Sequence, residues 1–275
     1  MPEQPHILLI TTDTQRWDTL RCMGSPFAQS PHTDRLAAEG VLFEQGHTTS
    51  PACAPARCSL ITGVHPQVHG VLENGIRPTF ELTNFPDLLA DAGYTGVLSG
   101  KAHFGKTPRG FQIDYRAEAS KTITARNIWL EALQEAGFSE KPVHYPHTVP
   151  DELYYDGFVT TKTMQGIEEA LESRPHAPFF AFCSMVSPHY PLNPPGDWGA
   201  LYRTEDLPPL PGTYSLETEP EQTRQLLRLG ERSLPSPEKI AEERRLYYGL
   251  AAYCDAQVGR LLRFLEARGL EENTL

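Results

Sequence analysis

Residues 7–13 read Ile-Leu-Leu-Ile-Thr-Thr-Asp, an apolar run that ends in a carboxylate. Such a run is typical of a buried strand. Open α/β sheets bind their ligands at the carboxyl ends of the strands, so we predict that Asp13 lies at a ligand-binding edge. The competing interpretation is that Asp13 only caps the turn that follows the strand.

The same pattern recurs at two later places. Residues 94–98 form an apolar run that leads to Lys101 and His103, and residues 179–186 lead to His189 in the run Ser-Pro-His-Tyr-Pro. In an extended chain the i, i+2 spacing projects Lys101 and His103 to the same side, where both can reach one anion. An imidazole such as His189 suits general acid chemistry because its ordinary pKa lies near neutrality. The alternatives are a solvated loop histidine at 103 and a histidine packed in a Pro-rich turn at 189.

Elements of two kinds alternate along the chain. Strand-like runs lie near residues 6–12, 41–48, 94–99 and 178–186, and helix-like stretches lie near 31–40, 85–92, 151–173 and 239–268. This alternation predicts an α/β fold with a mostly parallel central sheet flanked by helices. The interval 190–238 is rich in Pro, Glu and Leu, and we interpret it as a long excursion loop near the substrate entrance.

Residues 53–63 read Cys-Ala-Pro-Ala-Arg-Cys-Ser-Leu-Ile-Thr-Gly. Pro55 can open a helix, and the unpaired N–H groups at a helix start favour a nearby anion. A thiol at Cys53, four residues from Arg57, is therefore expected to have a lowered pKa and to be reactive. For an isolated cysteine the alternative is a small buried side chain at 53 and a surface salt bridge at 57.

The stretch resembles the signature of the sulfatase family, which is Cys or Ser-x-Pro-x-Arg followed by an apolar residue, Thr and Gly. Ile61 stands where Leu is usual, and the other signature positions match at Cys53, Pro55, Arg57, Thr62 and Gly63. The resemblance implies an alkaline-phosphatase-like α/β fold and the hydrolysis of sulfate esters. In that family the cysteine is oxidised to formylglycine, whose hydrated aldehyde is the nucleophile.

The resemblance also implies a divalent metal, held by Asp13 and residue 53. Calcium is the first candidate, with magnesium and manganese as alternatives. Many sulfatases have a second Asp where this chain has Thr14. That difference favours an alternative substrate, a phosphonate monoester or a phosphodiester, on the same fold.

Four side chains take catalytic roles by the same resemblance. Arg57 polarises the nucleophile, and Lys101 clamps the sulfate group. His103 removes the formylglycine hydroxyl proton, and His189 protonates the leaving alcohol.

The resemblance covers only the N-terminal part of the family's fold. Residues 271–275 read Glu-Glu-Asn-Thr-Leu, which in sulfatases leads into a strand with further metal ligands. We therefore expect residues 1–275 to be an incomplete N-terminal part of a single catalytic domain, without appreciable activity alone and prone to self-association through an open sheet edge. An inactive, anion-binding remnant is the remaining alternative.

Composition limits the partners. The net charge of −11 disfavours nucleic acid and anionic membranes, and no apolar run reaches membrane-spanning length. Because the N-terminus enters a strand almost at once, we expect no signal peptide, and the five scattered cysteines do not suggest a disulfide framework. We expect a cytoplasmic protein whose partners are a small anionic substrate and, transiently, the formylglycine-generating enzyme.

Overall fold

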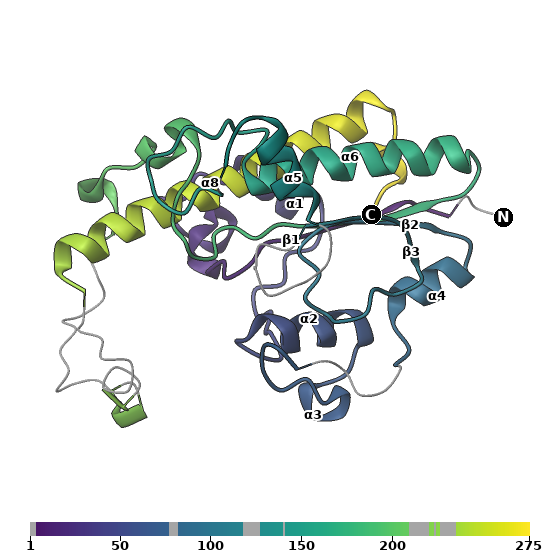
Figure 1. The fold of residues 1–275 in the computed structure, drawn as a ribbon, viewed down its shortest axis with the longest axis horizontal. Coiled ribbons are helices and arrows are strands. Elements are labelled where there is room, and N and C mark those ends of the chain that lie inside the picture. The colour runs from purple at the N-terminus through teal and green to yellow at the C-terminus, as the bar shows by residue number, and fades with distance from the viewer. Residues whose placement is uncertain are drawn as a thin grey trace.

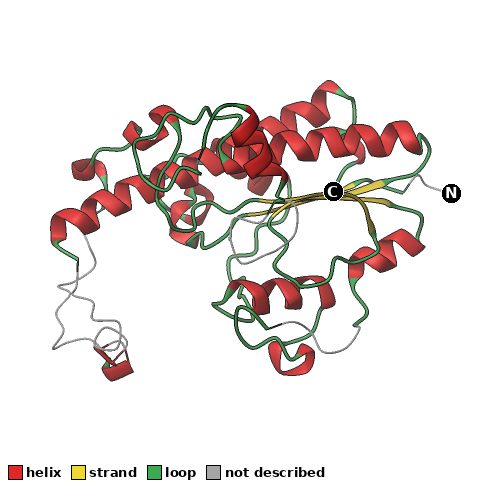
Figure 2. Cartoon of the chain, in the orientation of Figure 1, coloured by secondary structure: helices red, strands yellow, loops and turns green. Residues whose placement is uncertain are grey.

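A four-stranded parallel sheet forms the centre of the computed structural model, which describes residues 4–76, 82–117, 127–139, 141–208, 220–222, 224–225 and 235–275. The strand order is β1-β4-β2-β3, and all three pairings are parallel. The strands are β1 (Ile7–Thr11), β2 (Thr95–Gly100), β3 (Phe111–Arg116) and β4 (Phe179–Ser184). Figure 2 shows the sheet in yellow between two groups of helices. The predicted α/β fold class is confirmed.

The sheet is covered on both faces, which explains its apolar strands. In the central strand β4, Phe180 and Phe182 pack into the apolar cluster on one face, and Phe179 and Ala181 pack into a cluster on the other. Figure 1 shows the helices of each layer. One layer holds α2 (Cys53–Thr62), α3 (Pro66–His69) and α4 (Phe85–Asp91), and the opposite layer holds α1 (Pro31–Glu39), α5 (Ile128–Glu135), α6 (Tyr155–Ser173) and α8 (Pro237–Ala267).

Five short 3-10 helices also lie in the described part of the chain. They span Trp17–Thr19, Arg21–Met23, Gly196–Ala200, Thr204–Asp206 and Glu271–Asn273. After the last of them, residues 273–275 run beside the outer edge of β1, where the N–H of Leu8 donates to the carbonyl of Leu275 at 2.8 Å. In the described part of the chain, no helix is both long and apolar enough to cross a membrane.

A glycine lets β2 and β4 approach closely at their carboxyl ends. Gly100 has φ +89°, and a Cβ at this position would lie 2.1 Å from the carbonyl oxygen of Ser184. The next residue, Lys101, donates its N–H to that same oxygen at 3.0 Å. The absence of a side chain at residue 100 therefore brings the ends of the two central strands together.

Two expectations from the sequence need correction. Residues 41–48 form no strand, because in the described structure no sheet strand offers them a backbone partner, and Val41 and Phe43 are each 79% exposed. The interval 190–238 is not one long loop in its described parts, because two 3-10 helices lie in it and α8 begins at Pro237. Residues 209–219, 223 and 226–234 of that interval lie outside the described residues.

Candidate active site

Asp13 lies just beyond the end of β1, where its carboxylate is buried among cations. Oδ2 accepts hydrogen bonds from Lys101 Nζ at 2.7 Å and from Arg57 Nη2 at 3.1 Å, and Oδ1 accepts one from the Thr14 hydroxyl at 2.8 Å. Burial alone would raise the pKa of Asp13, but Lys101, Arg57 and the hydrogen bonds outweigh it and lower the pKa to about 2. The carboxylate is therefore ionised at neutral pH.

Cys53 is the first residue of α2, as the sequence predicted for the thiol beside a helix start. No side chain caps this helix at residue 52, and the N–H of Ala54 instead donates to Asn74 Oδ1 at 2.9 Å. The Cys53 thiol lies 3.9 Å from Asp13 Oδ1. Hydrogen bonds from His103 and then His189 stabilise the thiolate against the opposing effect of burial and lower the pKa of Cys53 to about 5. The pKa of Cys53 is lowered as expected, but its causes are the two histidines and Lys101 and not Arg57.

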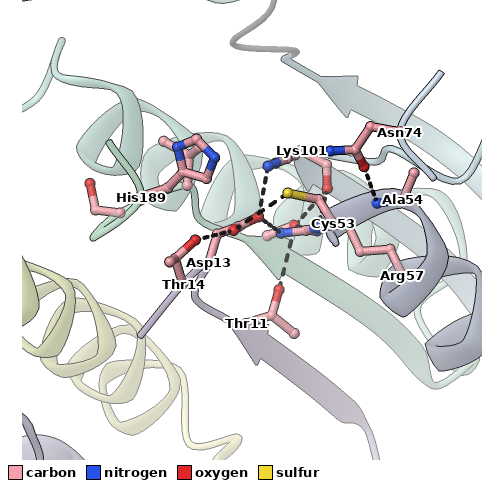
Figure 3. A network of polar contacts seen from close by, with 12 residues as sticks. Thr11, Asp13, Thr14, Cys53, Ala54, Arg57, Asn74, Lys101 and His189 are labelled. Atoms are coloured by element: carbon pink, nitrogen blue, oxygen red, sulfur yellow. Dashed lines mark hydrogen bonds and ion pairs between the residues drawn. The ribbon is translucent and has the colours of Figure 1, made fainter. Parts of the chain in front are cut away.

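Arg57 is buried and links four elements, and it is not a surface residue. One turn after Cys53, its Nη1 donates to the Lys101 carbonyl at 2.9 Å and to Ser184 Oγ at 2.6 Å, while Nη2 contacts Asp13. The Ser184 hydroxyl in turn donates to the Lys101 carbonyl at 2.6 Å. The guanidinium therefore ties α2 to the carboxyl ends of β1, β2 and β4, as Figure 3 shows in part.

Lys101 and His103 both reach the site, although by a different route from the one expected. The segment is not extended, because His103 has φ +55° in the left-handed region. Lys101 is buried against Asp13. Lys101 and His103 line a cavity together with Cys53. Their common orientation therefore comes from a turn and not from strand alternation.

His189 faces Cys53 from the segment after β4 (Figure 3). Its Nδ1 lies 2.6 Å from the carbonyl oxygen of Tyr190. Because a carbonyl can only accept, Nδ1 carries the hydrogen, and Nε2 remains for chemistry. The hydrogen bond with Cys53 raises the pKa of His189 above its usual value. A protonated imidazole beside a thiolate fits the role of a proton donor.

Two cavities meet at Cys53. The larger, about 630 Å³, lies beside the end of β1 and is lined by many hydroxyl groups, among them those of Thr11, Thr14 and Ser50. The smaller, about 280 Å³, is lined by Lys101, His103, His189 and several aromatic and proline side chains. The described residues that line this smaller cavity include no carboxylate. It therefore favours an anionic group joined to a compact apolar body.

The sulfatase family model matches residues 5–275. The chain belongs to the sulfatase family. It is 28% identical to an arylsulfatase of Clostridium perfringens, over 99% of this chain and 61% of that protein, and 28% identical to an ulvan-active sulfatase of Formosa agariphila, over 100% and 49%. The chain thus spans about half to three fifths of the length of these curated relatives.

Solved structures support the same fold. The phosphonate monoester hydrolase of Agrobacterium radiobacter superposes with a TM-score of 0.82 at 22% identity, over 99% of this chain and 61% of that one. The corresponding enzyme of Silicibacter pomeroyi gives 0.80 at 22% identity over the same shares. The alkaline-phosphatase-like fold suggested by the resemblance is therefore confirmed.

The donor set fits a metal in part. One ligand atom each from Asp13, Cys53 and His189 lie within 4.8 Å of one another. Asp13 Oδ2 is already used by Lys101 and Arg57, so Oδ1 is the oxygen that faces Cys53. Calcium takes about six to eight oxygen ligands, and these residues supply only a fraction of that number. Sequence reasoning predicted Asp13 and residue 53 for this site but not the proximity of His189.

Several supporting residues were not anticipated from the sequence. His69 is fully buried, with Nε2 3.0 Å from Ser59 Oγ and Nδ1 accepting the N–H of Val71. Asn74 and Ser184 also hold the site through contacts that have no sequence signature. These residues hold the site because segments distant in the sequence bury them, and a local sequence pattern does not predict such burial.

Proposed function

We propose that the protein hydrolyses sulfate monoesters, with formylglycine derived from Cys53 and with a divalent metal. The observation that carries the proposal is the position of Cys53, between a buried carboxylate with two cations and a pair of histidines. Formylglycine at this position would supply a hydrated aldehyde, whose oxygen is the nucleophile that this family uses. A metal held by Asp13 and residue 53 would supply Lewis-acid stabilisation of negative charge.

The cations of the site would hold the sulfate group. Lys101 lines the smaller cavity beside Cys53. Arg57 holds Asp13 and the Lys101 carbonyl in place through hydrogen bonds from its guanidinium. Because these groups are buried and fixed by hydrogen bonds, they need little reorganisation as charge develops on the sulfuryl oxygens. The acidic net charge of the chain is therefore compatible with an anionic substrate.

The two histidines would divide the proton transfers. The Nδ1–H of His189 donates to the Tyr190 carbonyl, so that Nε2 is available to donate a proton to the leaving alcohol. His103 contacts the position of the nucleophile and would accept the proton of the formylglycine hydroxyl. The smaller cavity would receive the alcohol part of the ester, and its aromatic lining suits a single ring.

A rate comparison tests this proposal. A form of the protein that carries the complete catalytic domain would be produced with the formylglycine-generating enzyme, because residues 1–275 alone are expected to have no appreciable activity. Initial rates would be measured on 4-nitrophenyl sulfate with added calcium. We expect Cys53→Ala to lower the rate by about two orders of magnitude or more, because the nucleophile is lost. Cys22→Ala is the matched control, since Cys22 is a partly buried cysteine outside both cavities at Cys53. Equal rates for the two variants would contradict the proposal.

Thr14 supports a second candidate, a phosphonate monoester or phosphodiester hydrolase. Its hydroxyl donates to Asp13 Oδ1, at a position where many sulfatases have a second carboxylate. One fewer negative charge would leave a less anionic metal site. Rates on an aryl sulfate and on the matching aryl phosphonate, measured with the same preparation, would decide between the two. A higher kcat/KM for the phosphonate would favour this second candidate.

A further inference from the structure

Asp156 is a buried carboxylate that the proposed chemistry does not use. It lies in the first turn of α6 and is fully buried. Its Oδ1 accepts the N–H of Val186 at 2.7 Å and that of Ser187 at 3.3 Å, whereas Oδ2 has no hydrogen-bond partner in the described structure. Burial raises the pKa of Asp156. A carboxylate in such surroundings is costly, so a specific task for it is the natural hypothesis.

The two N–H groups that Asp156 holds begin the segment that carries His189. The carbonyl of Val186 accepts the N–H of His189 at 3.0 Å, and the carbonyl of Ser187 accepts the N–H of Asp13 at 3.2 Å. A single carboxylate oxygen therefore binds the N–H groups of two residues, Val186 and Ser187, whose own carbonyls accept the N–H groups of His189 and Asp13. The position of both residues depends on this arrangement.

The far end of the same segment is held from the residue just before α6. The Tyr154 hydroxyl donates to Asn193 Oδ1 at 3.1 Å, and Asn193 Nδ2 donates to the carbonyl of Pro142 at 2.7 Å. Tyr154 and Asn193 are both buried. The start of α6 thus contacts the His189 segment on both sides, at residues 186–187 and at residue 193.

We propose that Asp156 and Tyr154 are positioning residues that hold the segment 186–193, and with it His189, against Cys53. Neither residue needs to touch the reacting atoms for this role. The proposal goes beyond the hydrolase function and rests on it only where His189 is treated as the proton donor.

Hydrogen–deuterium exchange tests the proposal whether or not the protein hydrolyses sulfate. In Asp156→Ala we expect the amides of Val186, Ser187 and His189 to exchange about tenfold faster or more, because two buried hydrogen bonds are lost. Asp156→Asn should exchange nearly as the unchanged protein does, since its amide oxygen can still accept both N–H groups. Tyr253→Phe is the control, because it also removes a buried hydroxyl, one that donates to the Asp151 carbonyl and not to this segment.

Tyr154→Phe keeps the test decisive if Asp156→Ala does not fold. It removes one hydroxyl only, and we expect about threefold faster exchange within residues 186–193. The proposal would be overturned if the amides of residues 186–193 exchanged no faster in Tyr154→Phe than in the Tyr253→Phe control. The same holds for Asp156→Ala if that variant folds.

Kinetics supply a second readout that a merely structural role would not affect. A displaced His189 should impair substrates with poor leaving groups most, so kcat/KM for an alkyl sulfate should fall at least about threefold further than for 4-nitrophenyl sulfate in Asp156→Ala. Asp156 suits this comparison because it does not line the smaller cavity, which would receive the alcohol, whereas Tyr154 does. Equal losses on the two substrates would remove the positioning role. If the unchanged protein hydrolyses neither ester, the hydrolase proposal fails, and the exchange experiment still decides this one.

Discussion

Replacement of Arg57 by Ala should destabilise the protein strongly, because its guanidinium is buried among groups that depend on it. The substitution removes contacts to Asp13, to the Lys101 carbonyl and to Ser184 Oγ, and the Arg57 and Asp13 side chains are each only 8% exposed. Loss of one partner from a buried ion pair costs about 3–5 kcal/mol. We expect the lower end of that range, about 3 kcal/mol, since Lys101 still pairs with Asp13 in the variant.

Urea denaturation monitored by circular dichroism would measure this loss, with a chelator present so that bound metal does not contribute. Arg109→Ala is the matched control, because Arg109 pairs with Asp91 in an exposed ion pair and should change the unfolding free energy little. Arg57→Lys should give an intermediate loss, since an ammonium cannot make the same set of contacts. A loss for Arg57→Ala no larger than that for Arg109→Ala would refute the reasoning.

Three further predictions concern the site. In protein without metal and with Cys53 not converted to formylglycine, the alkylation rate of Cys53 should rise with pH through about 5 and then level off, and His103→Ala should move this rise to higher pH. A rise near the ordinary thiol pKa in the unchanged protein would contradict the geometry. The free energy of unfolding should decline as pH falls from about 4 to 2, because Asp13 is protonated more readily when unfolded, and a denaturation series in which Asp13→Asn shows the same decline would exclude this cause. Gly100→Ala should lower the melting temperature strongly, since its Cβ would lie 2.1 Å from the Ser184 carbonyl oxygen. Gly137→Ala should lower it less, because Gly137 shares the positive φ but a Cβ there meets no atom within 4 Å, and equal shifts would argue against steric contact.

The sequence was informative wherever a local run determined the outcome. Apolar stretches bounded by turn residues located β1, β2 and β4, and the residue after each run reached the site because parallel strands present their carboxyl ends at one edge. The same reasoning failed for residues 41–48, whose pattern fits a strand but which find no backbone partner in the described structure. It also missed β3, whose residues alternate in burial at the sheet edge.

Contacts between distant segments were beyond the reach of sequence patterns. Asp156 resembles any helical aspartate in the sequence, and only the packing of α6 on β4 places it under Val186 and Ser187. In the same way, the left-handed conformation of His103 could not be inferred from an i, i+2 spacing. These positions depend on tertiary packing, which decides burial and backbone strain.

Peptide mass analysis of residue 53 tests the central claim most directly. The peptide that contains Cys53 would be isolated from protein produced with the formylglycine-generating enzyme and, in parallel, without it. We predict that the first sample shows the aldehyde in place of the thiol at this position and that the second shows a thiol that can be alkylated. An intact thiol at Cys53 in both samples would contradict the account.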